Sequence, residues 1–130
     1  MSDFSKALTV TTSGLKAQAT RLRHLSENIS NADTPGYRRK LVSFETAFSG
    51  GNGVSTVRPG PVRLDQSALE RVYDPAHPMS DAEGYFDGSN VDLMIELSDA
   101  REAQRSYEAN LKVFEQTRKM SSSLMDLLRK

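Results

Sequence analysis

Apolar side chains near the start of the chain return every seven residues in two tracks. The first track holds Leu8, Leu15, Leu22 and Ile29, and the second holds Phe4, Thr11, Gln18 and Leu25. Tracks separated by alternating steps of three and four residues are typical of the narrow seam of a coiled coil. The pattern therefore predicts an N-terminal helix over residues 1–30, with Ser2 or Asp3 as its N-cap.

The helical pattern stops in the stretch NISNADTPGYRRK, residues 28–40. Its Asn and Asp side chains compete for backbone hydrogen bonds, and Pro35 disfavours helical geometry at the residue before it. Pro35 and Gly36 suit the central positions of a type II turn, the second of which needs a positive φ. We expect an elbow here, with Asn28 and Asn31 capping or bridging backbone groups at the helix end. The elbow residues are Asn28, Asn31, Thr34, Pro35, Gly36 and Tyr37.

The segment 31–90 has a different character, because it holds all five prolines and seven of the eight glycines. The stretch VSTVRPGPVRLD, residues 54–65, alternates loosely and is interrupted by Pro-Gly-Pro, which predicts two short strands around a bend. The stretch LERVYDP, residues 69–75, is a third strand candidate. We expect a small, irregular β-rich insert between the elbow and the last segment.

A second apolar stripe runs along residues 91–130, and Ser89 followed by Asp92 predicts a capping box at its start. We expect a mainly α fold, in which the long N- and C-terminal helices pair as an antiparallel coiled coil around the β-rich insert. The segments 1–30, 31–90 and 91–130 would together form one domain. The side chains expected in its assembly core are Leu8, Leu15, Leu22, Ile29, Leu97, Tyr107, Leu111, Phe114 and Leu124.

Two polar residues, Gln104 and Asn110, fall on or near the second stripe. They fit two interpretations equally well. They belong either to a partly exposed helix flank or to the polar register residues of a helical assembly, as buried Asn does in coiled coils.

Charge and composition narrow the range of functions. The 130 residues carry 17 Lys and Arg and 17 Asp and Glu, so no net charge draws the chain to nucleic acid or to an anionic membrane. The basic triplet at 38–40 could contact phosphate, but in a balanced chain such a triplet is more often a solvated turn. Only 37% of the residues are hydrophobic, which indicates a limited core and a need for partner surfaces.

No constellation for catalysis or metal binding stands out. The chain has no Cys and two His, which excludes thiolate sites and a Cys nucleophile. His77 lies near Asp74 and Asp81 in sequence and could form a metal site with them, but no pair of ligands has helical i, i+4 spacing, so we expect a structural loop. A general base with an orienting partner is not apparent either. We therefore expect neither an enzyme nor a cofactor.

The N-terminal stretch MSDFSKALTV lacks both a basic region and a continuous apolar run, so a cleaved secretory signal is not expected. No apolar run approaches the roughly 20 residues of a membrane span. If the protein leaves the cytoplasm, we expect it to do so without a cleaved signal peptide.

Three stretches in order along the chain carry a resemblance to a known family. The stretch SGLKAQATRLRHLSENISNADTPGYRR, residues 13–39, resembles the N-terminal signature of bacterial flagellar rod, hook and related axial proteins. The stretch SNVDLMIELSDAREAQRSYEANLKVFEQTRKM, residues 89–120, resembles their C-terminal signature. The stretch YDPAHPMSDAEGYF, residues 73–86, resembles the corresponding stretch of a proximal-rod member of that family, and the short length of the chain is similar to that member as well.

This resemblance implies a structural subunit of the proximal rod of the flagellar basal body, which transmits torque across the periplasm. Similar subunits are exported by the flagellar type III apparatus and assemble helically. The implied partners are other proximal and distal rod proteins, the adaptor to the MS ring, and further copies of the chain. The alternative function is a soluble coiled-coil adaptor or export chaperone, which would need neither the elbow nor the proline-rich insert.

Overall fold

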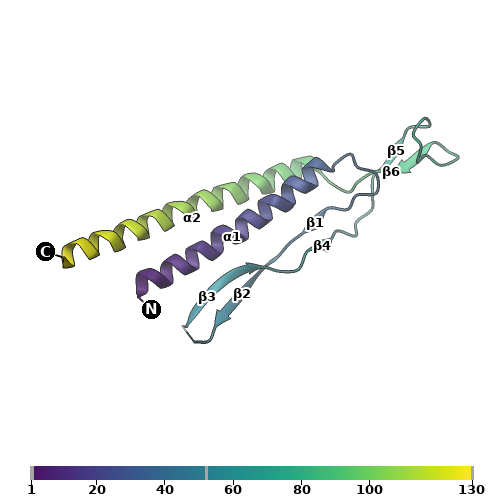
Figure 1. Ribbon diagram of the computed structural model, residues 1–130. Helices are drawn as coiled ribbons and strands as arrows, with labels where there is room; N and C mark the ends of the chain where they lie inside the picture. Colours follow the sequence, from purple (N-terminus) through teal and green to yellow (C-terminus); the bar gives the residue numbers. More distant parts are fainter. Residues whose placement is uncertain (1, 52, 130) are drawn as a thin grey trace.

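The fold is an elongated pair of helices with short β-hairpins between them in sequence (Figure 1). The computed structural model describes residues 2–51 and 53–129. Helix α1 (Asp3–Ser30) and helix α2 (Leu93–Leu128) lie side by side, with the two chain ends at the same end of the molecule. The coarse fold is therefore as predicted, with helices at both termini and a small antiparallel strand insert.

The strands form separate antiparallel pairs. Their bounds are β1 (Lys40–Leu41), β2 (Phe44–Ser49), β3 (Val54–Pro59), β4 (Arg63–Leu64), β5 (Arg71–Tyr73) and β6 (Tyr85–Asp87). β1 pairs with β4, β2 with β3, and β5 with β6. Hairpin β2–β3 packs along α1, where the Ser13 hydroxyl accepts a hydrogen bond from the Val57 amide at 3.2 Å. The strands predicted within 54–65 and 69–75 are thus present as β3, β4 and β5.

Both helices begin at side-chain caps. Ser2 is the N-cap of α1, and its hydroxyl accepts a hydrogen bond from the Ser5 amide at 3.1 Å, as expected. Asp92 is the N-cap of α2 and accepts from the Met94 amide at 3.0 Å. The prediction of a capping box that begins at Ser89 is wrong, because the Ser89 hydroxyl instead donates to the Ala32 carbonyl and accepts from the Val91 amide.

Small and polar residues line the contact between the helices. Ala17 and Ala103 are completely buried, and Asn110 of α2 lies against Gly14 of α1. A Cβ on Gly14 would stand 3.0 Å from the Asn110 amide nitrogen, so glycine permits this close approach. Gln104, in contrast, is exposed. The small side chains at this contact therefore let the two helix backbones approach closely.

The predicted core residues are not buried within the single chain. Leu97, Leu111 and Leu124 are 47%, 37% and 46% exposed. The other six, which are Leu8, Leu15, Leu22, Ile29, Tyr107 and Phe114, are partly exposed. Thr11 and Leu25 of the second track are buried instead, because the close approach at the alanines centres the contact on that side of α1.

Candidate functional site

A buried polar network ties the two helices and the first strand together at the end where α1 stops. Asn28 is its centre and is completely buried. Its side-chain oxygen accepts hydrogen bonds from the Tyr37 hydroxyl and the Lys40 amide, both at 2.8 Å. Its side-chain nitrogen donates to the Lys40 carbonyl at 3.1 Å and to a Glu96 oxygen at 3.2 Å. Every hydrogen-bonding position of the Asn28 amide is therefore used.

Glu96 carries the network into α2. Its carboxylate is completely buried and accepts a hydrogen bond from Nε of Arg39 at 2.6 Å, in addition to the one from Asn28. The Arg39 guanidinium also lies 3.4 Å from Asp65 and 3.9 Å from Asp99. We call Asn28, Tyr37, Arg39, Lys40 and Glu96 the junction. Its buried charge is paired and hydrogen-bonded, which is the condition under which burial is tolerated.

The ionisation of the junction follows from these contacts. Burial acts to lower the pKa of Arg39, but the hydrogen bonds and charges of Glu96 and Asp65 together outweigh it and raise the pKa above the ordinary value. Burial raises the pKa of the Tyr37 hydroxyl, which favours the protonated form that donates to Asn28. The 2.6 Å contact between Lys40 and Glu27 raises the pKa of the lysine and lowers that of the glutamate.

The elbow follows the junction directly. Asn31 is the C-cap of α1, and its side chain donates to the Glu27 carbonyl at 2.8 Å. The Tyr37 amide donates to the Thr34 carbonyl at 3.1 Å across Pro35 and Gly36, and Gly36 has a φ of 75°. These features define the predicted type II turn. The predicted capping role of Asn31 and the bridging role of Asn28 are both present.

The segment before α2 closes against this elbow. The Gly36 amide donates to the carbonyls of Asp87 and Gly88, at 3.2 and 3.0 Å. Asn90 then accepts from the Arg39 amide at 2.7 Å and donates to the Asp65 carbonyl at 2.9 Å. The elbow is consequently the point where the two ends of the insert meet.

Replacing Gly36 with valine tests whether this geometry is needed. No atom lies within 4 Å of a Cβ at this position, so the penalty comes from the positive φ alone, at about 1–2 kcal/mol. We expect both helices to form but the chain from Tyr37 onward to leave α1 in a wrong direction, so that the amide at position 36 loses its hydrogen bonds to Asp87 and Gly88 and exchanges its hydrogen faster. Gly36→Asn, which tolerates positive φ, is the matched control. Unchanged hydrogen exchange at position 36 in the Gly36→Val protein would show that the turn geometry is dispensable.

Several large apolar side chains of α2 face solvent. Met94, Val113 and Met120 are 77%, 53% and 52% exposed, and near the C-terminus Leu127 and Leu128 are 66% and 75% exposed. In Figure 1 α2 also continues past the start of α1, so its last turns have no helix beside them. Phe4 of α1 lines a groove of about 390 Å³ with Met120, Leu124 and Leu127 at that end. Exposed apolar surface of this extent is typical of a protein–protein contact.

The candidate ligand residues form no metal site. His77 stacks on Phe86, with ring centroids 4.0 Å apart, and its Nδ1 accepts a hydrogen bond from the Met79 amide. Asp81 is bound to Arg71 at 3.0 Å. Within residues 2–51 and 53–129, no group of three or more His, Asp or Glu is placed to hold a metal ion, and no helix combines the length and apolar character needed to cross a bilayer.

The elbow is predictable from the sequence, whereas the roles of Glu96, Arg39, Asn90 and Asp65 in the site are not. One signal was available, because Glu96 precedes Ala100 and Ala103 by four and seven residues and so shares their helix face. The partners Arg39, Asn90 and Asp65 carry no comparable local signal.

Two features together define a structural subunit that assembles with other chains: a polar junction that fixes two helices at one end, and apolar helix faces left open to solvent. Comparison with known proteins identifies the family of this structural subunit. The family model "Flagella basal body rod protein" matches residues 1–38, and "Flagellar basal body rod FlgEFG protein C-terminal" matches residues 82–127.

Individual relatives cover almost the whole chain. A protein of Agrobacterium fabrum named "Flagellar basal-body rod protein FlgC" is 43% identical over 99% of this chain and 98% of its own length. Proteins of the same name from Salmonella typhimurium and Bacillus subtilis are each 33% identical, over 88% and 93% of this chain and 90% and 95% of their own. The chain belongs to the FlgC family of flagellar basal-body rod proteins. It is a structural subunit of the basal-body rod rather than an enzyme.

Proposed function

We propose that the chain assembles helically in the proximal rod and transmits torque across the periplasm, through contacts made by the exposed faces of its two helices. The observation that carries this proposal is the row of solvent-exposed apolar side chains on α2, including Leu97, Leu111 and Leu124. A single chain leaves these side chains in water, and a neighbouring subunit would remove them from it. The partly exposed leucine track of α1 would be covered in the same way.

The two helices and the insert would act as one rigid domain, with the helices paired as an antiparallel coiled coil. Support comes from the covered face of α2, where alternating steps of four and three residues connect positions that are buried or partly buried. These positions are Glu96, Ala100, Ala103, Tyr107, Asn110, Phe114, Thr117 and Ser121. Asn110 would set the register, because it lies opposite Gly14, the residue that leaves room for its amide.

The partners follow from membership of a rod-protein family. Neighbours would be other proximal and distal rod proteins, the adaptor to the MS ring and further copies of this chain. The flagellar type III export apparatus would deliver the subunit without a cleaved signal peptide. A rod subunit must transmit force without bending at its elbow, and the fully bonded junction supports that requirement.

Leu124→Glu tests the assembly role directly. Because Leu124 is 46% exposed in the single chain, we expect the purified subunit to lose no more than about 0.5 kcal/mol of stability. A charge in a subunit interface is costly, so cells carrying this variant should lack rods and fail to swim. Ser122→Glu, on an exposed position of the same turn, is the matched control. The measurements are thermal unfolding, electron microscopy of isolated basal bodies, and swimming in soft agar; normal rods in the Leu124→Glu cells would contradict the proposal.

A further inference from the structure

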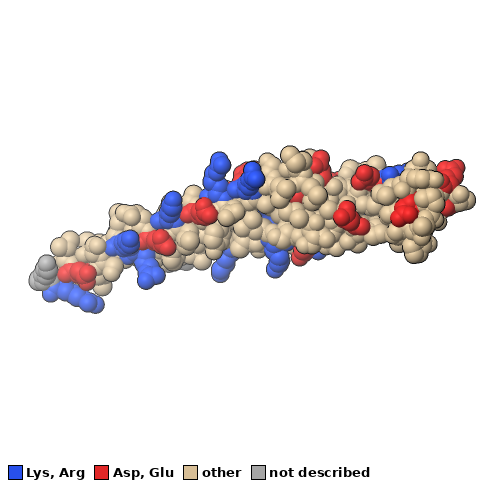
Figure 2. Space-filling view, turned by 90° about the horizontal axis from the view of Figure 1, so that it is seen from above, with Lys and Arg blue, Asp and Glu red and all other residues tan. Residues whose placement is uncertain are grey.

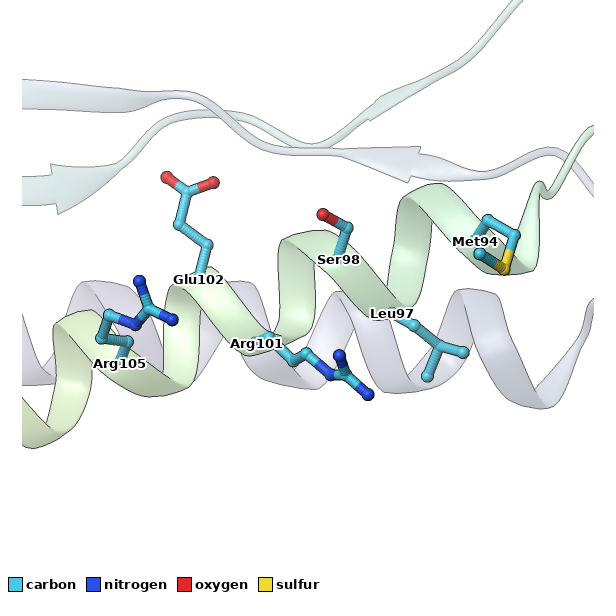
Figure 3. A pocket seen from close by; sticks show the side chains of 6 residues that line it. All are labelled: Met94, Leu97, Ser98, Arg101, Glu102 and Arg105. Carbon is cyan, nitrogen blue, oxygen red and sulfur yellow. The ribbon is translucent and has the colours of Figure 1, made fainter.

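One side of α2, close to its start, is hollowed into a groove of about 530 Å³. We call it the α2 groove. Its lining side chains are Met94, Leu97, Ser98, Arg101, Glu102 and Arg105. Figure 3 shows Leu97 and Arg101 on one flank and Ser98 and Glu102 on the other. All of these residues are exposed and all come from α2, so within the described chain the groove has no opposite wall.

The α2 groove combines apolar surface with unpaired positive charge. Met94 and Leu97 are 77% and 47% exposed. Glu102 is paired with Arg21 of α1 at 3.8 Å. Arg101 and Arg105 have no carboxylate within 4 Å anywhere in residues 2–51 and 53–129, so their charges remain available to another chain.

The hairpin β5–β6 has the complementary surface. We call residues 69–88 the acidic lobe. Tyr73 and Met79 are each 63% exposed there. Among the described residues no cation lies within 4 Å of the carboxylates of Glu83 and Asp87, whereas Asp81 is paired with Arg71. In Figure 1 the acidic lobe projects beyond the ends of the helices, which leaves it free to contact another subunit.

Acidic and basic residues are also separated over the molecule as a whole. The acidic lobe, residues 69–88, holds five Asp and Glu and one Arg, a net charge of −4 in a chain whose overall charge is zero. Figure 2 shows Lys and Arg predominating over the helices, and Asp and Glu over the end that carries β5 and β6. Such a separation favours contacts between unlike parts of neighbouring copies and disfavours contacts between like parts.

We propose that the acidic lobe of one copy of this chain occupies the α2 groove of a second copy. Tyr73 and Met79 would lie against Met94 and Leu97, while Glu83 and Asp87 face the two arginines. Because different surfaces meet, the contact is heterologous and can be repeated from copy to copy around a rod. The inference rests on the proposed function, and it adds which surfaces meet when copies assemble.

A charge exchange tests the contact in cells that carry the chain as their only copy. Arg101→Glu with Arg105→Glu should abolish swimming without shifting the unfolding temperature of the purified subunit, since both residues are exposed. Adding Glu83→Arg and Asp87→Arg should restore swimming, because the opposite charges then face each other again. Lys112→Glu with Arg118→Glu makes the same charge change elsewhere on α2 and is the control for charge alone. Failure of the fourfold variant to swim better than the double variant would overturn the proposal.

Disulfide trapping identifies what occupies the α2 groove. The chain has no native Cys, so only the introduced cysteines of this chain can form the cross-link. Isolated rods carrying Met79→Cys and Leu97→Cys should give dimers and larger multimers of this chain on oxidation, whereas either single variant, or Met79→Cys with Ser122→Cys, should not. Intact rods without the cross-link, or a cross-link to a different rod protein, would overturn the proposal and leave the rod function standing. Rods that assemble normally without this chain would instead refute the proposed function.

Discussion

Replacing Glu96 with glutamine is expected to destabilise the subunit by about 3 kcal/mol, the cost of breaking a buried charge pair. The two oxygens of Glu96 accept from Nε of Arg39 and from the Asn28 amide. Glutamine keeps the shape but has one oxygen and one NH2 group. Whichever way the amide is turned, a donor then faces a donor, and the Arg39 charge loses its buried counterion.

Thermal unfolding of the purified subunit measures this effect, which for a chain of this size corresponds to a fall of about 10 °C in Tm. Glu102→Gln is the matched control, because the Glu102 side chain is 69% exposed and its pairing with Arg21 is a surface contact. Equal Tm values for the two variants would mean that the junction contributes nothing to stability.

Leu25→Ala should cost about 3 kcal/mol of stability, and Leu15→Ala about 1 kcal/mol, although both leucines belong to the same heptad pattern. Leu25 is 6% exposed, so its removal leaves a cavity at the contact between the helices. Leu15 is only partly covered in the single chain, so its truncation removes less buried surface.

Urea unfolding of the purified variants separates the two cases. The expected order tests which of the two tracks forms the contact inside the subunit. If Leu15→Ala proved as costly as Leu25→Ala, the track that contains Leu15 would form the contact between the helices inside the subunit. The proposal that the exposed positions on α2 form an interface between subunits would then lose its support.

Local chemistry made parts of this fold predictable from sequence. The period of seven located the N-terminal helix, because a helix repeats its faces at nearly that interval. The Pro35–Gly36 pair predicted the turn and the positive φ of Gly36, since few residues other than glycine adopt that conformation freely. Ser2 was one of two candidate N-caps, and its hydroxyl forms the cap.

The seam between the helices was harder to predict. Two tracks lay on neighbouring faces of α1, and the larger side chains favoured the wrong one for contact within the chain. Ala17 and Ala103 decide the choice, but their effect depends on a meeting between residues far apart in sequence. The junction has the same difficulty, because Arg39 and Glu96 look like surface charges until the fold brings them together.

The junction also governs when this fold can form. Asn28 and Glu96 are 68 residues apart, and Arg39 and Glu96 are 57 apart. Closing a loop of that length has an entropic cost that must be met before the contacts can stabilise it, so we expect the junction to form late in folding. While any part of the chain between Asn28 and Glu96 remains in a narrow passage, the junction stays open. A chain that passes through a channel, in either direction, therefore cannot form the junction during passage. The junction forms only once both helices have reached the same side.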